Sequence, residues 1–128
     1  MKLITQVALS VMGCLASAAL SAADLAGYWQ HEDEPARIEI MFEGGVGTGT
    51  VRYNEKYPER VGRILLKDLK AREGEADRWN GQVYAERLEE YKDAEITLPE
   101  PDQMQIKVKV GFMSRTVNWT RVSGLPED

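Results

Sequence analysis

Apolar and polar residues alternate with a period of two along much of this chain, which is the pattern of half-buried β-strands. The clearest examples are residues 37–42 and 104–112, where every second side chain is apolar, so that Phe42 and Phe112 are expected on core-facing sides. Weaker apolar runs predict further strands, and residues 96–98 look extended. These further predicted strands are residues 48–53, 61–71, 79–84 and 114–122.

Glycine and proline mark the connections between these strands. Glu43-Gly44-Gly45 separates the first alternating segment from residues 48–53, which predicts a β-hairpin. Pro99-Glu100-Pro101-Asp102 predicts a turn before the longest alternating segment. Gly47 and Gly49, within or beside a predicted strand, indicate bending or a close approach of backbone.

One segment, residues 85–94, has two interpretations. Leu88 and Tyr91 recur at helical spacing among good helix formers, which favours a short helix. Its glutamate and lysine content fits a solvated hairpin arm equally well. The sequence leaves helix, loop and hairpin open here.

Several short strands with frequent turn signals are typical of an all-β sandwich or barrel. Because closure of a sheet removes its exposed edges, we favour a small antiparallel β-barrel. About 105 residues follow position 23, which is enough for one domain and too few for two. We therefore expect a barrel domain over residues 24–122 and a polar tail over residues 123–128.

The first 23 residues have the organisation of a secretory signal peptide. Lys2 supplies the positive start, residues 3–20 are mainly apolar, and Ser21-Ala22-Ala23 offers a small-x-small cleavage pattern before Asp24. This predicts a periplasmic or secreted protein. The alternative is a lipoprotein anchored through Cys14, because Val11-Met12-Gly13-Cys14 loosely resembles a lipobox.

Charge and cysteine content exclude several classes of function. The chain carries 16 basic and 21 acidic residues, without a clustered basic face, which argues against a nucleic-acid partner. Cys14 is the single cysteine, so a chain cleaved after Ala23 has no disulfide, thiol nucleophile or cysteine metal site.

No residue pattern in the chain supports an assigned reaction. His31-Glu32-Asp33-Glu34 is the one cluster of metal-ligand type, and a solvated loop explains it better because no second histidine exists. Glu86, Glu89 and Glu90 cannot be told apart from ordinary surface charge. We assign no catalytic, metal or cofactor-binding residue, and expect no enzyme activity and no cofactor.

Aromatic residues are the better candidates for a functional role. Trp29, Tyr53, Trp79 and Tyr84 could line the barrel as an apolar wall with a few polar tips. The alternative is that they fill it, since small barrels have interiors barely wide enough for their own side chains.

Three motifs resemble a family of small exported bacterial proteins known as domain of unknown function 2147. They are Gly27-Tyr28-Trp29, Trp79-Asn80-Gly81-Gln82-Val83-Tyr84, and Ser114-Arg115-Thr116-Val117-Asn118-Trp119-Thr120-Arg121. The resemblance implies a lipocalin-like barrel and no assigned activity. The Gly-x-Trp opening and the late arginine also resemble the wider lipocalin and fatty-acid-binding-protein group. That second resemblance implies that Gly27, Trp29, Trp119 and Arg121 close the barrel, with the Arg121 guanidinium across the Trp29 indole and donating to backbone carbonyls.

The sequence thus predicts an exported, non-catalytic protein that binds a small apolar or amphipathic ligand. The alternative is a filled barrel that serves as a protein–protein interaction or structural module of the cell envelope. A membrane association is expected only if Cys14 is lipidated. Neither ligand, partner nor oligomeric state follows from the sequence.

Overall fold

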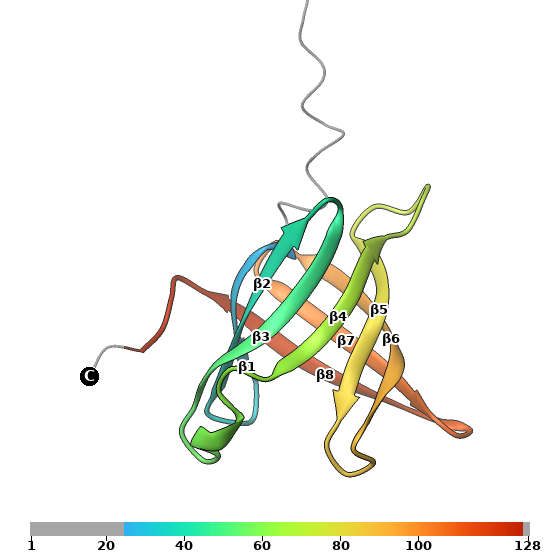
Figure 1. The fold of residues 1–128 in the computed structure, drawn as a ribbon. Coiled ribbons are helices and arrows are strands. Elements are labelled where there is room, and N and C mark those ends of the chain that lie inside the picture. The colour runs from blue at the N-terminus through green and yellow to red at the C-terminus, as the bar shows by residue number, and fades with distance from the viewer. Residues whose placement is uncertain (1–24, 127–128) are drawn as a thin grey trace, which may run out of the picture.

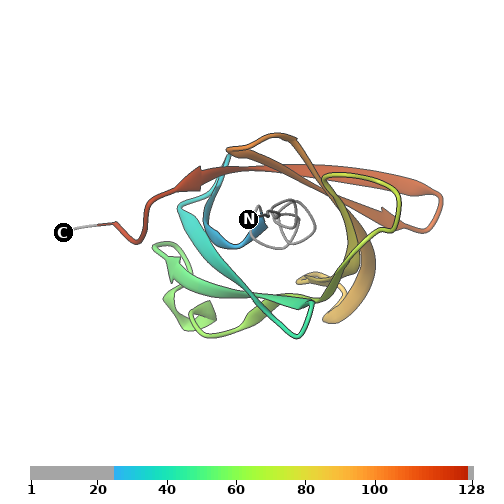
Figure 2. The same cartoon turned by 90° about the horizontal axis from the view of Figure 1, so that it is seen from above.

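The computed structural model describes residues 25–126, in which eight antiparallel strands follow one another around a closed barrel (Figure 1). The first strand pairs with the last, Tyr28 opposite Val122, and the strands form a ring when viewed from above (Figure 2). The strands are β1 (Gly27–His31), β2 (Ala36–Glu43), β3 (Val46–Asn54), β4 (Ile64–Ala71), β5 (Arg78–Ala85), β6 (Glu90–Glu100), β7 (Gln103–Val110) and β8 (Met113–Val122). The predicted all-β antiparallel barrel is confirmed. The predicted signal peptide, Cys14 and the last two residues of the tail lie outside the described residues.

Helical structure is sparse in the described part of the chain. A 3-10 turn, η2 (Pro58–Arg60), interrupts the connection between β3 and β4. Between positions 25 and 126, no helix is long and apolar enough to cross a membrane.

The hairpin of β2 and β3 forms where the glycine pair predicts it. Glu43 and Val46 are direct partners, so Gly44 and Gly45 alone make the turn. Both glycines have positive φ, 61° and 84°, which side chains other than glycine adopt at a cost. Gly49 faces the interior, where a Cβ atom would lie 3.1 Å from Leu66.

The helical interpretation of residues 85–94 is wrong. β5 continues to Ala85, a turn follows, and β6 begins at Glu90. Tyr84 and Tyr91 are cross-strand partners with ring centroids 5.2 Å apart. Pairing with β5 over the full length of the hairpin outweighs the weak helical propensity of the segment, and Glu89 adopts a positive φ of 54° to complete the turn.

Two irregularities explain why other segments fit a simple alternation poorly. In β4 the register shifts between Lys67 and Lys70, and Asp68 has φ 55°, so Leu66 and Leu69 both face the core although three positions separate them. In β3 the register shifts opposite Arg37 and Ile38.

The shift in β3 changes the face on which its last residues lie. Ile38 pairs with Val51, whereas Arg37 pairs with Tyr53. Directly opposite residues share one face, so Tyr53 lies with Arg37 on the outside of the barrel. Asn54 takes the inner position instead and is 8% exposed, with its Oδ1 accepting a 2.7 Å hydrogen bond from the Tyr57 backbone N–H.

The prediction for the end of the longest alternating segment is also wrong. β7 ends at Val110, and Gly111 and Phe112 form a two-residue turn between the partners Val110 and Met113. Phe112 is therefore 98% exposed rather than part of a core face. Alternation alone cannot show where a strand stops when the turn residues continue the pattern.

Candidate functional site

The two ends of the barrel differ in structure. Because the strands are antiparallel and consecutive, the β2–β3, β4–β5 and β6–β7 connections lie at the end where the described chain begins (Figure 1). The other four connections lie at the opposite end. We refer to these as the closed end and the open end.

The closed end is filled by Trp29 and sealed by Arg121. Trp29 is fully buried, and its indole N–H donates a 3.0 Å hydrogen bond to the carbonyl of Leu25. The Arg121 guanidinium carbon lies 4.4 Å from the centroid of the indole, within the range of a cation–π contact. The same guanidinium donates to the carbonyls of Ala26 (2.9 Å) and Pro101 (3.1 Å), which joins the start of the barrel to the β6–β7 turn.

Gly27 allows this arrangement. Its φ is 130°, and a Cβ atom at this position would lie 3.0 Å from Nη1 of Arg121. A side chain would be strained by the backbone conformation and would crowd the guanidinium.

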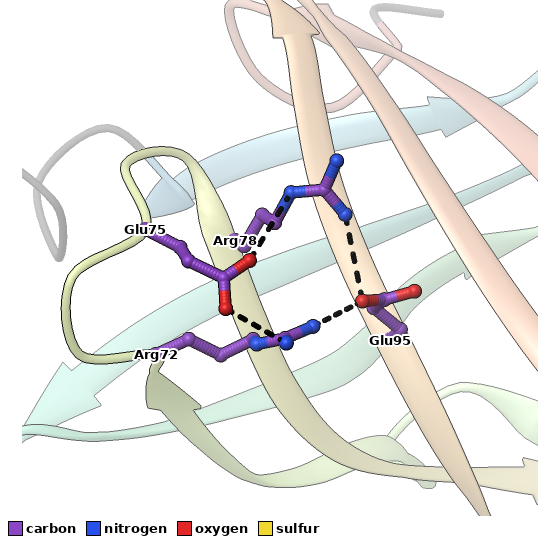
Figure 3. Close-up of polar contacts among 4 residues, drawn as sticks. All are labelled: Arg72, Glu75, Arg78 and Glu95. Carbon is purple, nitrogen blue, oxygen red and sulfur yellow. Dashed lines mark hydrogen bonds and ion pairs between the residues drawn. The ribbon is translucent and has the colours of Figure 1, made fainter.

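An ion-pair cluster holds the β4–β5 loop at the closed end (Figure 3). Glu95 on β6 pairs with both Arg72 and Arg78, which flank the loop, and Glu75 within the loop pairs with the same two arginines. All four side chains are 31–47% exposed, so the cluster positions the loop and contributes modestly to stability.

The open end contains a cavity of about 830 Å³ that is open to solvent. This lies within the range of small-molecule sites, about 300–1,000 Å³. Its inner wall is mainly aliphatic, with one indole from β8 at its base. The apolar lining residues are Ala36, Ile38, Val51, Leu65, Val83, Ala85, Leu88, Ile106, Val108, Val110, Met113, Val117 and Trp119.

Basic side chains predominate among the charged residues that line the mouth. Five are basic and two are acidic, in a chain whose net charge is −5. Arg63 and Arg60, from the β3–β4 loop, both pair with Glu86 of the β5–β6 turn. Among residues 25–126 neither Arg87 nor Arg115 forms an ion pair. The charged lining residues are Glu34, Lys56, Arg60, Arg63, Glu86, Arg87 and Arg115.

The aromatic residues predicted to line the barrel are distributed over different parts of the molecule. Trp29 and Trp79 are fully buried and are not among the residues that line the cavity. Tyr53 lies on the outer face. Tyr84 borders the mouth, where the Arg63 guanidinium carbon is 5.7 Å from its ring centroid.

Trp119, predicted to help close the barrel, lines the cavity instead of filling the closed end with Trp29. It is 4% exposed and lines the cavity, and its ring packs edge-to-face against His31 at 4.9 Å between centroids. His31 is held at the end of β1 because its Nδ1 accepts the backbone N–H groups of Asp33 (2.9 Å) and Glu34 (3.1 Å). Over the described residues, no group of three or more His, Cys, Asp or Glu side chains is placed to hold a metal ion.

The charged residues of the mouth were missed at the sequence level. Arg63 and Glu86 are 23 positions apart on different connections, and no motif links them. Arg115 lies two residues before Val117 on β8, so the alternation of that strand could have placed it on the inner face.

Among solved structures, the chain is similar to protein HP1028 from Helicobacter pylori, described as a member of the lipocalin family. The TM-score is 0.61 at 15% sequence identity, over 77% of this chain and 83% of that one. At this identity the likeness shows the fold alone, which is therefore a lipocalin-like β-barrel. No protein-family profile matches the chain.

Two curated fungal proteins match short segments of the chain. The O-methyltransferase dpmpI of Macrophomina phaseolina is 34% identical over 47 residues, and the O-methyltransferase lepI of Aspergillus flavus is 42% identical over 43 residues. These matches cover 36% and 34% of this chain but only 24% and 11% of the two relatives. Segments shorter than half of the barrel carry no activity over to it.

Proposed function

We propose that this protein binds a small amphipathic ligand in the open half of its barrel without transforming it. The observation that supports this most strongly is the cavity of about 830 Å³, because a barrel filled from end to end would leave no such space. The apolar wall would take the hydrophobic part of the ligand, and the mouth would take its polar end.

The charges at the mouth favour an anionic polar end, such as a carboxylate or a phosphate. Arg115 lines the cavity without an acidic partner among the described residues, and Arg63 is balanced by Glu86 alone. A guanidinium binds either anion through two parallel N–H donors. The ligand anion would compete with Glu86 for Arg63 and would pair directly with Arg115.

The same proposal places the protein in the periplasm, as a member of the domain of unknown function 2147 family. It draws on the organisation of residues 1–23 and on the three motifs, whose order and spacing extend over most of the barrel. A non-catalytic role is supported by the position of His31, whose Nδ1 already accepts two backbone hydrogen bonds.

The test is a titration with 11-(dansylamino)undecanoic acid, whose emission rises and shifts to the blue in an apolar site. We expect saturable binding of one probe per chain. Val117→Trp fills the cavity from its wall and should weaken binding at least tenfold. Thr116→Trp is the matched control, because Thr116 is the exposed neighbour on the same strand and does not line the cavity.

Charge recognition is tested separately with Arg115→Gln and with the methyl ester of the probe. Arg115→Gln should weaken binding of the acid about tenfold and leave the ester unchanged. Thermal unfolding of each variant establishes that the fold is kept, and Val108→Trp replaces Val117→Trp if the latter does not fold. Equal probe affinity in the folded cavity-filling variant and its control would exclude the cavity as the binding site.

A further inference from the structure

The tip of the β7–β8 hairpin exposes three apolar side chains, of which Val110 and Met113 also border the mouth of the cavity whereas Phe112 does not line it. Phe112 is 98% exposed, Met113 64% and Val110 43%. They account for three of the eight exposed large hydrophobic residues between positions 25 and 126, and they are contiguous apart from Gly111. Single exposed apolar residues are ordinary on protein surfaces, whereas a cluster at a projecting tip indicates a contact with something else.

The geometry of the turn does not require an aromatic residue. Gly111 supplies the positive φ, 64°, that a two-residue hairpin needs. The second turn position commonly holds a polar residue such as Asn, Asp or Ser. Phe112 at this position therefore does not serve the folding of the hairpin.

The hairpin projects beyond the rest of the sheet (Figure 1). The pairing of β7 with β6 ends at Val108, opposite Ala94, and the pairing of β8 with β1 ends at Trp119, opposite His31. We call residues 107–116 the β7–β8 arm. Its outer part is supported only by its own pairing, beside the mouth of the cavity.

The arm is basic although the protein is acidic. It contains Lys107, Lys109 and Arg115 and no acidic residue, and the whole hairpin from 103 to 122 contains none either. The net charge of the chain is −5, so this strip stands apart from the rest of the surface. An apolar tip with cations behind it is complementary to an anionic lipid surface, which offers hydrocarbon beneath a negative headgroup layer.

The pairing register gives the depths of these groups. Val110 and Met113 form the first pair behind the turn, Lys109 and Ser114 the second, and Val108 and Arg115 the third. At roughly 3.3 Å per residue, Lys109 and Arg115 lie about 3 and 7 Å behind the first pair. The headgroup layer of one leaflet is roughly 5–7 Å thick, so both cations reach it when the tip enters the hydrocarbon boundary. Lys107 pairs with Thr116 in the fourth pair, about 10 Å behind the first, which is still within about one Debye length of the headgroup charge.

We propose that the β7–β8 arm docks this protein onto anionic lipid surfaces, with Phe112 and Met113 inserted, Lys109 and Arg115 at the headgroups and Lys107 just behind them. Docking would bring the mouth of the cavity against the bilayer. The proposal does not rest on the proposed function, because vesicle binding is measured with no ligand in the cavity.

The experiment is co-sedimentation of the full chain with vesicles of equal parts phosphatidylglycerol and phosphatidylcholine, compared with phosphatidylcholine alone. All variants are prepared with the same N-terminus, verified by mass, so that residues 1–23 contribute equally. Phe112→Ser combined with Met113→Ser should weaken binding to the anionic vesicles at least tenfold. Met41→Ser, which removes a methionine of similar exposure from β2, should leave it unchanged.

Charge is tested with Lys107→Gln and Lys109→Gln, each expected to weaken binding to the anionic vesicles about fivefold at low salt. Lys70→Gln, an exposed lysine on β4, is the control and should have no such effect. Binding of the unmodified chain should fall steeply as the salt concentration rises.

Phe112→Trp reports the depth of the tip directly, because it keeps an aromatic residue there. Its added emission should shift to the blue on anionic vesicles and be quenched by brominated lipid chains. The three native tryptophans supply the background measured in the unmodified protein. An emission spectrum unchanged by vesicles would overturn the proposal. Concentration-dependent dimerisation that is lost in Phe112→Ser, without vesicle binding, would also overturn it and assign the tip to a second copy of the chain.

Discussion

Trp29 and Trp79 are both fully buried, and they differ in one respect that a paired substitution can measure. The Trp29 indole N–H donates to the Leu25 carbonyl at 3.0 Å, whereas the Trp79 indole N–H has no hydrogen-bond partner within residues 25–126. Replacing either by phenylalanine removes the N–H and a similar volume. We expect Trp29→Phe to destabilise the barrel much more than Trp79→Phe.

The difference follows from the contacts of each ring. Trp29→Phe leaves a buried carbonyl unpaired, which costs about 1–3 kcal/mol. It also weakens the cation–π contact with Arg121, at about 0.5–1 kcal/mol. Trp79→Phe removes an unpaired buried donor, so the polar gain offsets part of its packing loss. The two variants should therefore differ by at least about 2 kcal/mol, or roughly 8–16 °C in Tm for a domain of this size.

Equilibrium unfolding in urea, followed by circular dichroism, measures this difference without depending on tryptophan emission. The urea dependence of the unfolding free energy should be similar in both variants, which shows that the same surface is exposed. Stabilities within about 0.5 kcal/mol of each other, or a larger loss for Trp79→Phe, would refute the reasoning.

Two further substitutions test the packing of the sheet and the closed-end ion pairs. Gly81→Ala would place a Cβ atom 2.4 Å from Leu69 Cδ2 and 3.0 Å from a backbone oxygen. It should lower the unfolding free energy, measured by chemical denaturation, by about 1–3 kcal/mol. The control Gly124→Ala, whose Cβ would have no atom within 4 Å, should change it by less than about 0.5 kcal/mol. Equal stability of these two variants would contradict the close packing at Gly81. Glu95→Gln removes the negative charge shared by Arg72 and Arg78 and should cost up to about 1 kcal/mol at low salt, measured in the same way. That cost should shrink in 1 M NaCl, and a larger effect insensitive to salt would contradict an exposed cluster.

The fold could be predicted because strand alternation and glycine or proline turns are local signals. Residues 37–42 and 104–110 reveal their buried faces without reference to any other strand. Which face of the sheet each residue occupies along a whole strand, by contrast, is set by pairing between strands. The irregularity at Asp68 and the shift opposite Arg37 each change which face the following residues occupy, and nothing adjacent in the sequence marks them.

Prediction of the candidate site was limited by the same effect. Strict alternation along the strand predicts that Tyr53 lies on the same inner face as Val51, whereas the register shift puts it on the outer surface. The Arg63–Glu86 pair depends on two connections meeting at one end of the barrel, which requires the closed topology. The aromatic content predicted a cavity lined by aromatic side chains, but Trp29 and Trp79 are fully buried and do not line the cavity.

A cleaved signal peptide and a lipid anchor on Cys14 place different geometric constraints on a barrel that docks through the β7–β8 arm. Trp29 and Arg121 donate to the backbone carbonyls of Leu25 and Ala26, so the described part of the chain begins at the closed end. Met113 and Arg121 are eight residues apart on β8, or about 26 Å along the strand.

A lipid on Cys14 would leave ten residues to reach Asp24, spanning at most about 33–36 Å when fully extended. With the tip of the arm in the same leaflet, most of that length would have to be held extended, at a cost in conformational entropy. Cleavage before Asp24 imposes no such constraint, because the arm then approaches any lipid surface independently of the N-terminus. Docking through the arm is therefore more compatible with a released periplasmic protein than with an anchored one.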